Sequence, residues 1–198
     1  SNYSVFCHNF TIHFRFVASD YLTLDDKYQV VIERDHLGVP HILGDRDVDA
    51  AFGFAYAQAE DNWQIIHDTI PFYRGTNAAI NGQDAATVDF LIQWLEIWET
   101  VDANYDSALK PETHAWINAF VDGINYYAAL HPEQTNQSIF PITGKDVIAG
   151  YMLRHLLFYG FDGSITELFE DQRQHPISRG PADPNKQAEP MAAGVTIG

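Results

Sequence analysis

The stretch "ERDHLGVPHILGDRDVDAAFGFAYAQAEDNWQ", Glu33–Gln64, decides the fold of this chain. Residues 28–34, which run into it, are rich in β-branched side chains and predict a strand. Gly38-Val39-Pro40 then interrupts the pattern, and His41-Ile42-Leu43 resumes an extended run. Strand, tight turn and strand are therefore the expected order at the front of the fold.

A helix is expected directly after this hairpin. From Asp47 to about His67, apolar and small residues recur at spacings of three and four, which is a helical period. Asp45 and Asp47 offer side-chain oxygens for its N-cap. A second helix over 64–73, or a continuation of the first, is expected to kink at Pro71.

Further helices are expected down the chain. Residues 85–101 read as one helix with an apolar stripe of Phe90, Leu91, Trp94, Leu95 and Trp98. Pro111 marks the first turn of the next helix, which should end at His131-Pro132. Another helix is expected over 144–161. From Gln174 on, the chain is rich in Pro, Gly and polar residues and predicts a linker.

The composition limits the classes of partner. The chain has 198 residues, a formal net charge of -16 and 46% apolar residues, which indicates a folded domain rather than disorder. Because so acidic a chain repels phosphate groups, neither nucleic acid nor an anionic membrane surface is expected as a partner. No apolar run reaches the ~20 residues of a membrane-spanning helix. Cys7 is the only cysteine, so no intrachain disulfide can form.

Two patterns in the deciding stretch resemble metal sites. His36 and His41 are five residues apart, which does not place two ligands on one helix face, so hydrogen-bonding or packing roles are favoured. The segment "DRDVD", Asp45–Asp49, resembles the start of a calcium loop. Ala50 and Tyr56 stand where that loop requires Gly and Glu, so a capping or solvated role is favoured.

The sequence contains no recognisable self-sufficient active site. Glu60 and Asp61 are adjacent on a predicted helix, and adjacent helical positions do not face each other, so they make a poor acid–base pair. No Gly-rich phosphate loop, CxxC pair, HExxH or GxSxG motif occurs. A binding domain, a structural domain or one subunit of a split enzyme remain open from the residues alone.

The deciding stretch also resembles the N-terminal fingerprint of the penicillin acylase family of N-terminal nucleophile hydrolases. That fingerprint reads D-x-x-G-V-P-H-I, then a short acidic linker, then F-G-x-x-x-A-Q-x-x-D/E in a helix. The residues at its positions are Asp35, Gly38, Val39, Pro40, His41, Ile42, Phe52, Gly53, Tyr56, Ala57, Gln58 and Glu60 or Asp61. The resemblance covers residues 28–173, expected to be one domain, and residues 1–27 are an N-terminal extension without a counterpart in it.

In that family a precursor cuts itself into a small α chain and a large β chain that begins with the catalytic serine. The resemblance therefore implies that this chain is an α subunit and that residues 174–198 form a linker or spacer before the maturation site. The nucleophile is then expected one residue past Gly198. The implied fold is α+β, a mostly helical α subunit of a four-layer αββα sandwich that a β subunit completes.

The reaction implied by the resemblance is hydrolysis of the amide bond in an N-acylated small molecule. The β-chain serine attacks the acyl carbonyl, its own α-amino group acts as base, and an acyl-enzyme forms. An oxyanion hole from the β chain holds the tetrahedral intermediate. The resemblance implies no catalytic residue in this chain, no required cofactor, and a periplasmic or secreted location.

Family α chains place a late helix over the acyl pocket, and here that helix corresponds to residues 144–161. The resemblance puts His155, Phe158 and Tyr159 at pocket-lining positions, with plain core packing as the alternative. Some members bind calcium through an α-chain glutamate shortly after this helix. Glu167 is the nearest candidate ligand for such a structural calcium, with a solvated surface glutamate as the alternative.

The expected substrate follows from the same helix. Its apolar and aromatic character favours a hydrophobic acyl chain, as in the acyl-homoserine lactone and lipopeptide acylases of the family. Phe158 stands where penicillin-preferring members carry an arginine-like residue. Penicillin G or glutaryl-cephalosporin specificity is an alternative, although a glutaryl carboxylate would require a cation such as Arg154 or a protonated His155. A non-enzymatic helical binding domain is the alternative from another class.

Overall fold

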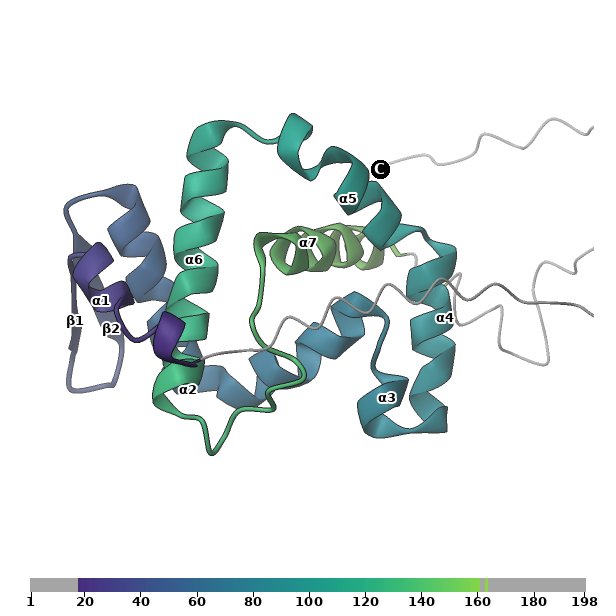
Figure 1. Ribbon diagram of the computed structural model, residues 1–198, viewed down its shortest axis with the longest axis horizontal. Coiled ribbons are helices and arrows are strands. Elements are labelled where there is room, and N and C mark those ends of the chain that lie inside the picture. Colours follow the sequence, from purple (N-terminus) through teal and green to yellow (C-terminus); the bar gives the residue numbers. More distant parts are fainter. Residues whose placement is uncertain (1–17, 161–162, 164–198) are drawn as a thin grey trace, which may run out of the picture. The chain divides into compact units, whose positions relative to one another are not determined.

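A computed structural model describes residues 18–160 and residue 163 of the chain. The described part is mostly helical with one small antiparallel sheet, as predicted (Figure 1). Residues 18–158 lie in one compact unit, which ends at Phe158. The elements, in chain order, are η1 (Ala18–Asp20), α1 (Leu24–Lys27), β1 (Val30–Arg34), β2 (Pro40–Gly44), α2 (Asp47–Arg74), α3 (Ala78–Asn81), η2 (Gln83–Ala85), α4 (Ala86–Trp94), α5 (Ile97–Ala108), α6 (Pro111–Leu130) and α7 (Gly144–Phe158).

The hairpin of β1 and β2 confirms the predicted strand, turn and strand. The strands pair antiparallel, with Ile32 opposite Ile42 at the centre of the register. In the turn, the Asp35 carboxylate accepts hydrogen bonds from the backbone N–H groups of Leu37 at 2.9 Å and Val39 at 3.0 Å. Gly38 has a φ of 82°, a left-handed conformation that favours glycine. The side chain of Asp35 and the glycine together therefore fix the turn.

Two sets of contacts hold the hairpin against α2. A Cβ atom on Gly53 would lie 2.5 Å from a methyl group of Val30 and 3.0 Å from one of Ile42, so glycine permits the close approach of helix and sheet. At the far end of the hairpin, the Arg34 guanidinium pairs with Glu60 at 2.9 Å and with Asp61 at 3.0 Å. The two adjacent carboxylates thus share one cation and serve a structural role.

The start of α2 differs from the prediction. The N-cap is Arg46, and neither Asp45 nor Asp47 supplies the capping oxygen. The capping carboxylate belongs to Asp49, which accepts the backbone N–H of Arg46 at 3.1 Å and the Nε of the same arginine at 2.8 Å. It also accepts the backbone N–H of Gln29 at 3.1 Å, so the same buried side chain joins the helix to the segment before β1.

The break in α2 lies at Asn62 and not at Pro71, so the predicted position of the kink was wrong. Asn62 has the non-helical angles φ -136° and ψ 33°, whereas Pro71 lies inside the last part of the helix. Asparagine competes with helical hydrogen bonding through its own side chain, which favours a break at this residue. The next residue, Trp63, is buried and donates its indole N–H to the Gln134 carbonyl at 3.1 Å.

The single helix predicted over 85–101 is two helices, α4 and α5. Glu96 has a φ of 51°, a left-handed conformation that ends α4 and redirects the chain. As a result the predicted apolar stripe does not form one buried face. Phe90 and Trp94 are 65% and 59% exposed, while Ile92 and Ile97 are buried in a cluster with Leu153 of α7.

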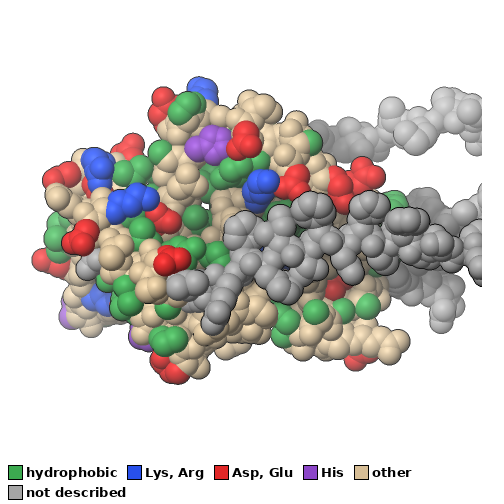
Figure 2. All heavy atoms as spheres, viewed as in Figure 1, with side chains coloured by type: hydrophobic (Ala, Val, Ile, Leu, Met, Phe, Trp, Pro, Cys, Tyr) green, Lys and Arg blue, Asp and Glu red, His purple; other side chains and the backbone are tan. Residues whose placement is uncertain are grey.

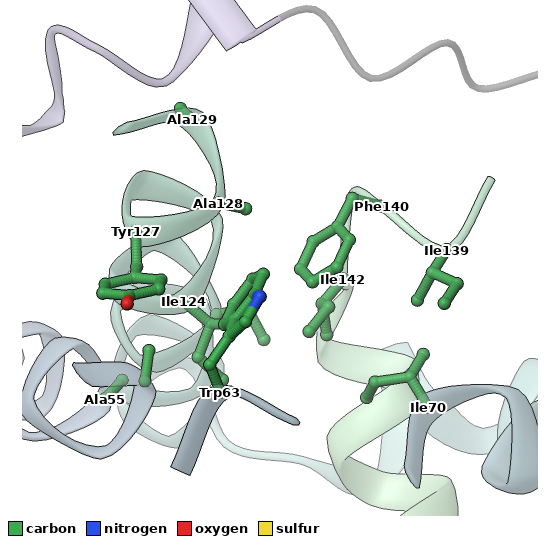
Figure 3. Packing of buried hydrophobic residues seen from close by; sticks show 12 residues of the cluster. Ala55, Trp63, Ile70, Ile124, Tyr127, Ala128, Ala129, Ile139, Phe140 and Ile142 are labelled. Carbon is green, nitrogen blue, oxygen red and sulfur yellow. The ribbon is translucent and has the colours of Figure 1, made fainter. Parts of the chain in front are cut away.

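The main core joins α2, α6 and the segment that precedes α7. In Figure 3, the ring of Trp63 on α2 lies between Tyr127 of α6 and Phe140, at centroid distances of 4.9 Å and 5.2 Å. The α2 and α6 backbones approach closely at Gly123, where a Cβ atom would lie 2.3 Å from the Phe52 carbonyl oxygen. These contacts fix where the chain enters α7.

The described surface mixes acidic and apolar side chains, as the face in Figure 2 shows. Within residues 18–160 and 163, no helix combines the length and the apolarity that a membrane crossing requires.

Candidate functional site

The first turn of α7 is anchored by a buried ion pair that the sequence did not reveal. Asp146, 1% exposed, accepts hydrogen bonds from the Arg74 guanidinium at 2.6 Å and 3.0 Å. It also accepts the backbone N–H and the hydroxyl of Thr143, at 2.7 Å and 2.9 Å. Arg74 additionally donates to the carbonyls of Ile139 and Pro141. The end of α2 therefore fixes the start of α7.

One turn later, α7 packs directly on an aromatic ring of α2. A Cβ atom on Gly150 would lie 2.4 Å from Cε2 of Tyr73, so only glycine fits there without movement. The backbone of Tyr73 is held in turn, because its carbonyl accepts the indole N–H of Trp98 at 2.9 Å. Ala149 and Leu153 complete this packed side of α7. They belong to what we call the second core cluster, the buried group of Ile92, Ile97, Val101, Ala149 and Leu153.

The other side of α7 presents a stripe of aromatic side chains. Tyr151, His155 and Phe158 lie four and three residues apart, which places them on one helical face. Tyr151 is 63% and Phe158 81% exposed, and the rings of Tyr151 and His155 lie 5.4 Å apart. The three rings form what we call the α7 stripe.

The positions predicted for an acyl pocket fall on or beside the α7 stripe. His155 and Phe158 belong to it, and Tyr159 follows the helix directly and is 75% exposed. On this part of the helix Leu153 is the buried residue, at 3% exposure. Tyr151, four positions before His155, shares this helical face and was not among the predicted positions.

The structure assigns a backbone role to the Asp35 turn. Leu37 and Val39 donate backbone hydrogen bonds to the Asp35 carboxylate, and these bonds lower its pKa. His41 Nε2 lies 3.5 Å from the same carboxylate, and His36 is exposed. No group of three or more His, Cys, Asp or Glu side chains able to hold a metal occurs within residues 18–160 and 163. The predicted calcium ligand, Glu167, lies outside the described residues.

The segment Asp45–Asp49 also has a structural role. The Arg46 guanidinium lowers the pKa of Asp49 from 3.8 to about 2. Its carboxylate is therefore charged at neutral pH and fully occupied in capping α2. Glu60 and Asp61 pair with Arg34, so these carboxylates also have structural partners.

Known proteins are similar to this chain over most of its length. The sequence matches the penicillin amidase family over residues 29–172. Acyl-homoserine lactone acylase PvdQ from Pseudomonas syringae pv. tomato is 29% identical over 155 residues, which cover 70% of this chain and 19% of that protein. PvdQ from Pseudomonas fluorescens strain Pf0-1 is 27% identical, over 69% of this chain and 19% of that protein.

A solved structure shares the fold. A thermostable penicillin G acylase from Alcaligenes faecalis superimposes with a TM-score of 0.58 at 20% sequence identity. The match covers 78% of this chain and 98% of that one. The chain therefore spans about a fifth of the curated relatives, 19% in the first of them, yet nearly all of one chain of the solved acylase.

Proposed function

The chain belongs to the penicillin amidase family, and on this basis we propose that it is the α subunit of a heterodimeric amide hydrolase. The observation that carries the proposal is the family match over residues 29–172. The shares of the related chains that the match covers add to it. The match covers 98% of one chain of the solved acylase but only about a fifth of the curated relatives. A partner β subunit from the same precursor accounts for both values.

The proposed reaction places the chemistry in the β subunit. The N-terminal serine hydroxyl attacks the carbonyl carbon of the substrate amide, and its proton passes to the free α-amino group of the same residue, directly or through water. The C–N bond breaks, the amine leaves with that proton, and an acyl-enzyme remains. Water then attacks the ester and releases the acid. In this scheme the α subunit binds the acyl group and supplies no catalytic residue.

The proposed substrates carry a long apolar acyl chain, with N-acyl-homoserine lactones or lipopeptides as the classes. The support is the exposed α7 stripe, whose rings offer apolar contact area and whose members Phe158 and Tyr151 carry no charge. His155, Phe158 and Tyr159 are the proposed acyl-chain contacts. Two of the curated relatives that match this chain are named for acyl-homoserine lactones.

Two further proposals also rest on the resemblance to the family. Glu167 is the proposed α-chain ligand of a structural calcium, and the catalytic reaction itself requires no cofactor. The mature heterodimer is proposed to act in the periplasm or outside the cell, within a four-layer αββα sandwich that the β subunit completes.

Intact-mass spectrometry and N-terminal sequencing of the full-length natural gene product test the proposal. We expect two chains, of which the larger begins with Ser, Thr or Cys. A single uncut polypeptide without such an N-terminus would refute maturation and favour a non-enzymatic helical binding domain.

A further inference from the structure

The position of the exposed face of α7 depends on how closely the packed face of this helix approaches α2. Gly150 packs on α2 and Leu153 lies in the second core cluster, whereas Tyr151, His155 and Phe158 lie on another face of the same helix, roughly 80–140° around its axis from Gly150. A change in how closely α7 approaches α2 at Gly150 therefore shifts the α7 stripe together with the helix.

A close approach of α7 to α2 occurs between Gly150 and the ring of Tyr73. A Cβ atom at position 150 would meet ring atoms of Tyr73 at 2.4, 2.7 and 2.8 Å. Carbon atoms in contact prefer ~3.5–4.0 Å, so one added methyl group would displace the helix or the ring by about 1 Å.

Neither partner can easily yield. The side chain of Tyr73 packs against both the main core and the second core cluster. Its backbone carbonyl accepts a hydrogen bond from Trp98. The start of α7 is fixed by the ion pair of Asp146 with Arg74, so the helix cannot simply slide away. Because tightly packed interiors transmit strain, the displacement should appear in the second half of α7, where the stripe lies.

We propose that the contact of Gly150 with Tyr73 sets the depth of the acyl-binding site and so the length of acyl chain that the enzyme accepts. Both are positioning residues, since they act through the α7 stripe and do not themselves touch substrate. The inference rests on the proposed function, because it requires that the α7 stripe contact the acyl chain.

The test compares kcat/KM of the full-length matured protein for N-dodecanoyl- and N-hexanoyl-homoserine lactone. Gly150→Ala should lower the ratio of dodecanoyl to hexanoyl activity by about tenfold, since a displacement of this size costs about one methylene of pocket length and one methylene discriminates by 10–200-fold. Adding Tyr73→Leu to Gly150→Ala should restore the ratio to within about threefold. Tyr73→Phe, which keeps the ring, should leave the ratio unchanged.

A matched control separates positioning from loss of stability. Gly53→Ala introduces the same methyl group at a similarly close contact, 2.5 Å from Val30, but between α2 and the hairpin. It should lower Tm without moving the selectivity ratio. If Gly53→Ala shifts the ratio as much as Gly150→Ala does, the positioning role is wrong.

The remaining outcomes are also decisive. If Gly150→Ala does not fold, Tyr73→Leu alone must raise the dodecanoyl to hexanoyl ratio, because α7 can settle closer to α2; an unchanged ratio overturns the inference. If the unmodified protein hydrolyses both substrates and no variant moves the ratio, the inference fails and the proposed function stands. If the unmodified protein cleaves neither amide, the proposed function fails and the inference with it.

Discussion

At the scale of single residues, the ionisation of Asp49 makes the stability of the fold depend on pH. Its carboxylate is buried, caps α2, pairs with Arg46 and accepts the Gln29 N–H. The pKa is lowered from 3.8 to about 2 in the folded state, so its stabilising contribution is present above pH 4 and is lost as the pH falls toward 2. Asp49→Asn should lower the free energy of unfolding by about 1–3 kcal/mol at pH 7.

Chemical denaturation at several pH values checks this prediction. Between pH 4 and pH 2 the stability of Asp49→Asn should fall less steeply than that of the unmodified protein. The matched control is Asp47→Asn, an exposed carboxylate two residues earlier in the same helical turn. It should change stability by less than about 0.5 kcal/mol. Equal slopes for the Asp49 variant and the unmodified protein would contradict the role of its ionisation.

Phe158 carries the second prediction at this scale. Its ring is exposed at the end of the α7 stripe, so Phe158→Ala should cost little stability in this chain. If the ring contacts the acyl chain, the variant should lose about tenfold in kcat/KM on N-dodecanoyl-homoserine lactone, in keeping with ~1–3 kcal/mol of lost apolar contact. Steady-state kinetics decide, and an unchanged rate would remove Phe158 from the site.

At the scale of elements, the attachment of α7 to α2 depends on the pair of Arg74 with Asp146. Arg74→Met leaves a buried carboxylate without its cation and should cost about 3–5 kcal/mol. Hydrogen exchange should also accelerate in the first turns of α7. Lys145→Met removes the neighbouring exposed pair with Asp102 and should cost at most about 1 kcal/mol. Similar losses for the two variants would contradict the anchoring role.

The sequence predicted those elements that local chemistry determines. The hairpin was predictable because its β-branched strands flank a turn with Gly38, and α6 because Pro111 marks its first turn. The predicted helix over 85–101 failed because the left-handed residue at the break, Glu96, is a good helix former and carries no turn signal. Tertiary packing of Ile92 and Ile97 into one cluster decides that break.

The candidate site was predictable only in part. The positions His155, Phe158 and Tyr159 came from a family resemblance, and all three side chains are exposed. The anchors behind it could not be predicted from spacing, because Arg74 and Asp146 are far apart in the chain and meet only when α2 and α7 pack. The same holds for Tyr73 and Gly150, whose contact depends on the approach of two helices.

At the scale of the whole molecule, several large apolar side chains of the described residues are exposed. Val31 and Leu43 face each other on the outer side of the hairpin at 54% and 64% exposure, and Phe90, Trp94 and Phe158 add further apolar area. Expressed alone, residues 1–198 should form concentration-dependent assemblies, whereas the natural full-length product should be monodisperse. Light scattering after gel filtration checks this, and a stable monomer of the isolated chain would contradict it.

The central claim is that the protein to which this chain belongs cleaves the amide of N-acylated small molecules. Its most direct test is mass spectrometry of the products after the full-length matured protein is incubated with N-dodecanoyl-homoserine lactone, with penicillin G as the competing substrate. The account predicts free dodecanoic acid and intact homoserine lactone, formed faster than penicillin G is cleaved. Ring-opened N-dodecanoyl-homoserine with its amide intact, or no reaction with either substrate, would contradict amide hydrolysis, and a clear preference for penicillin G would contradict the role of the α7 stripe.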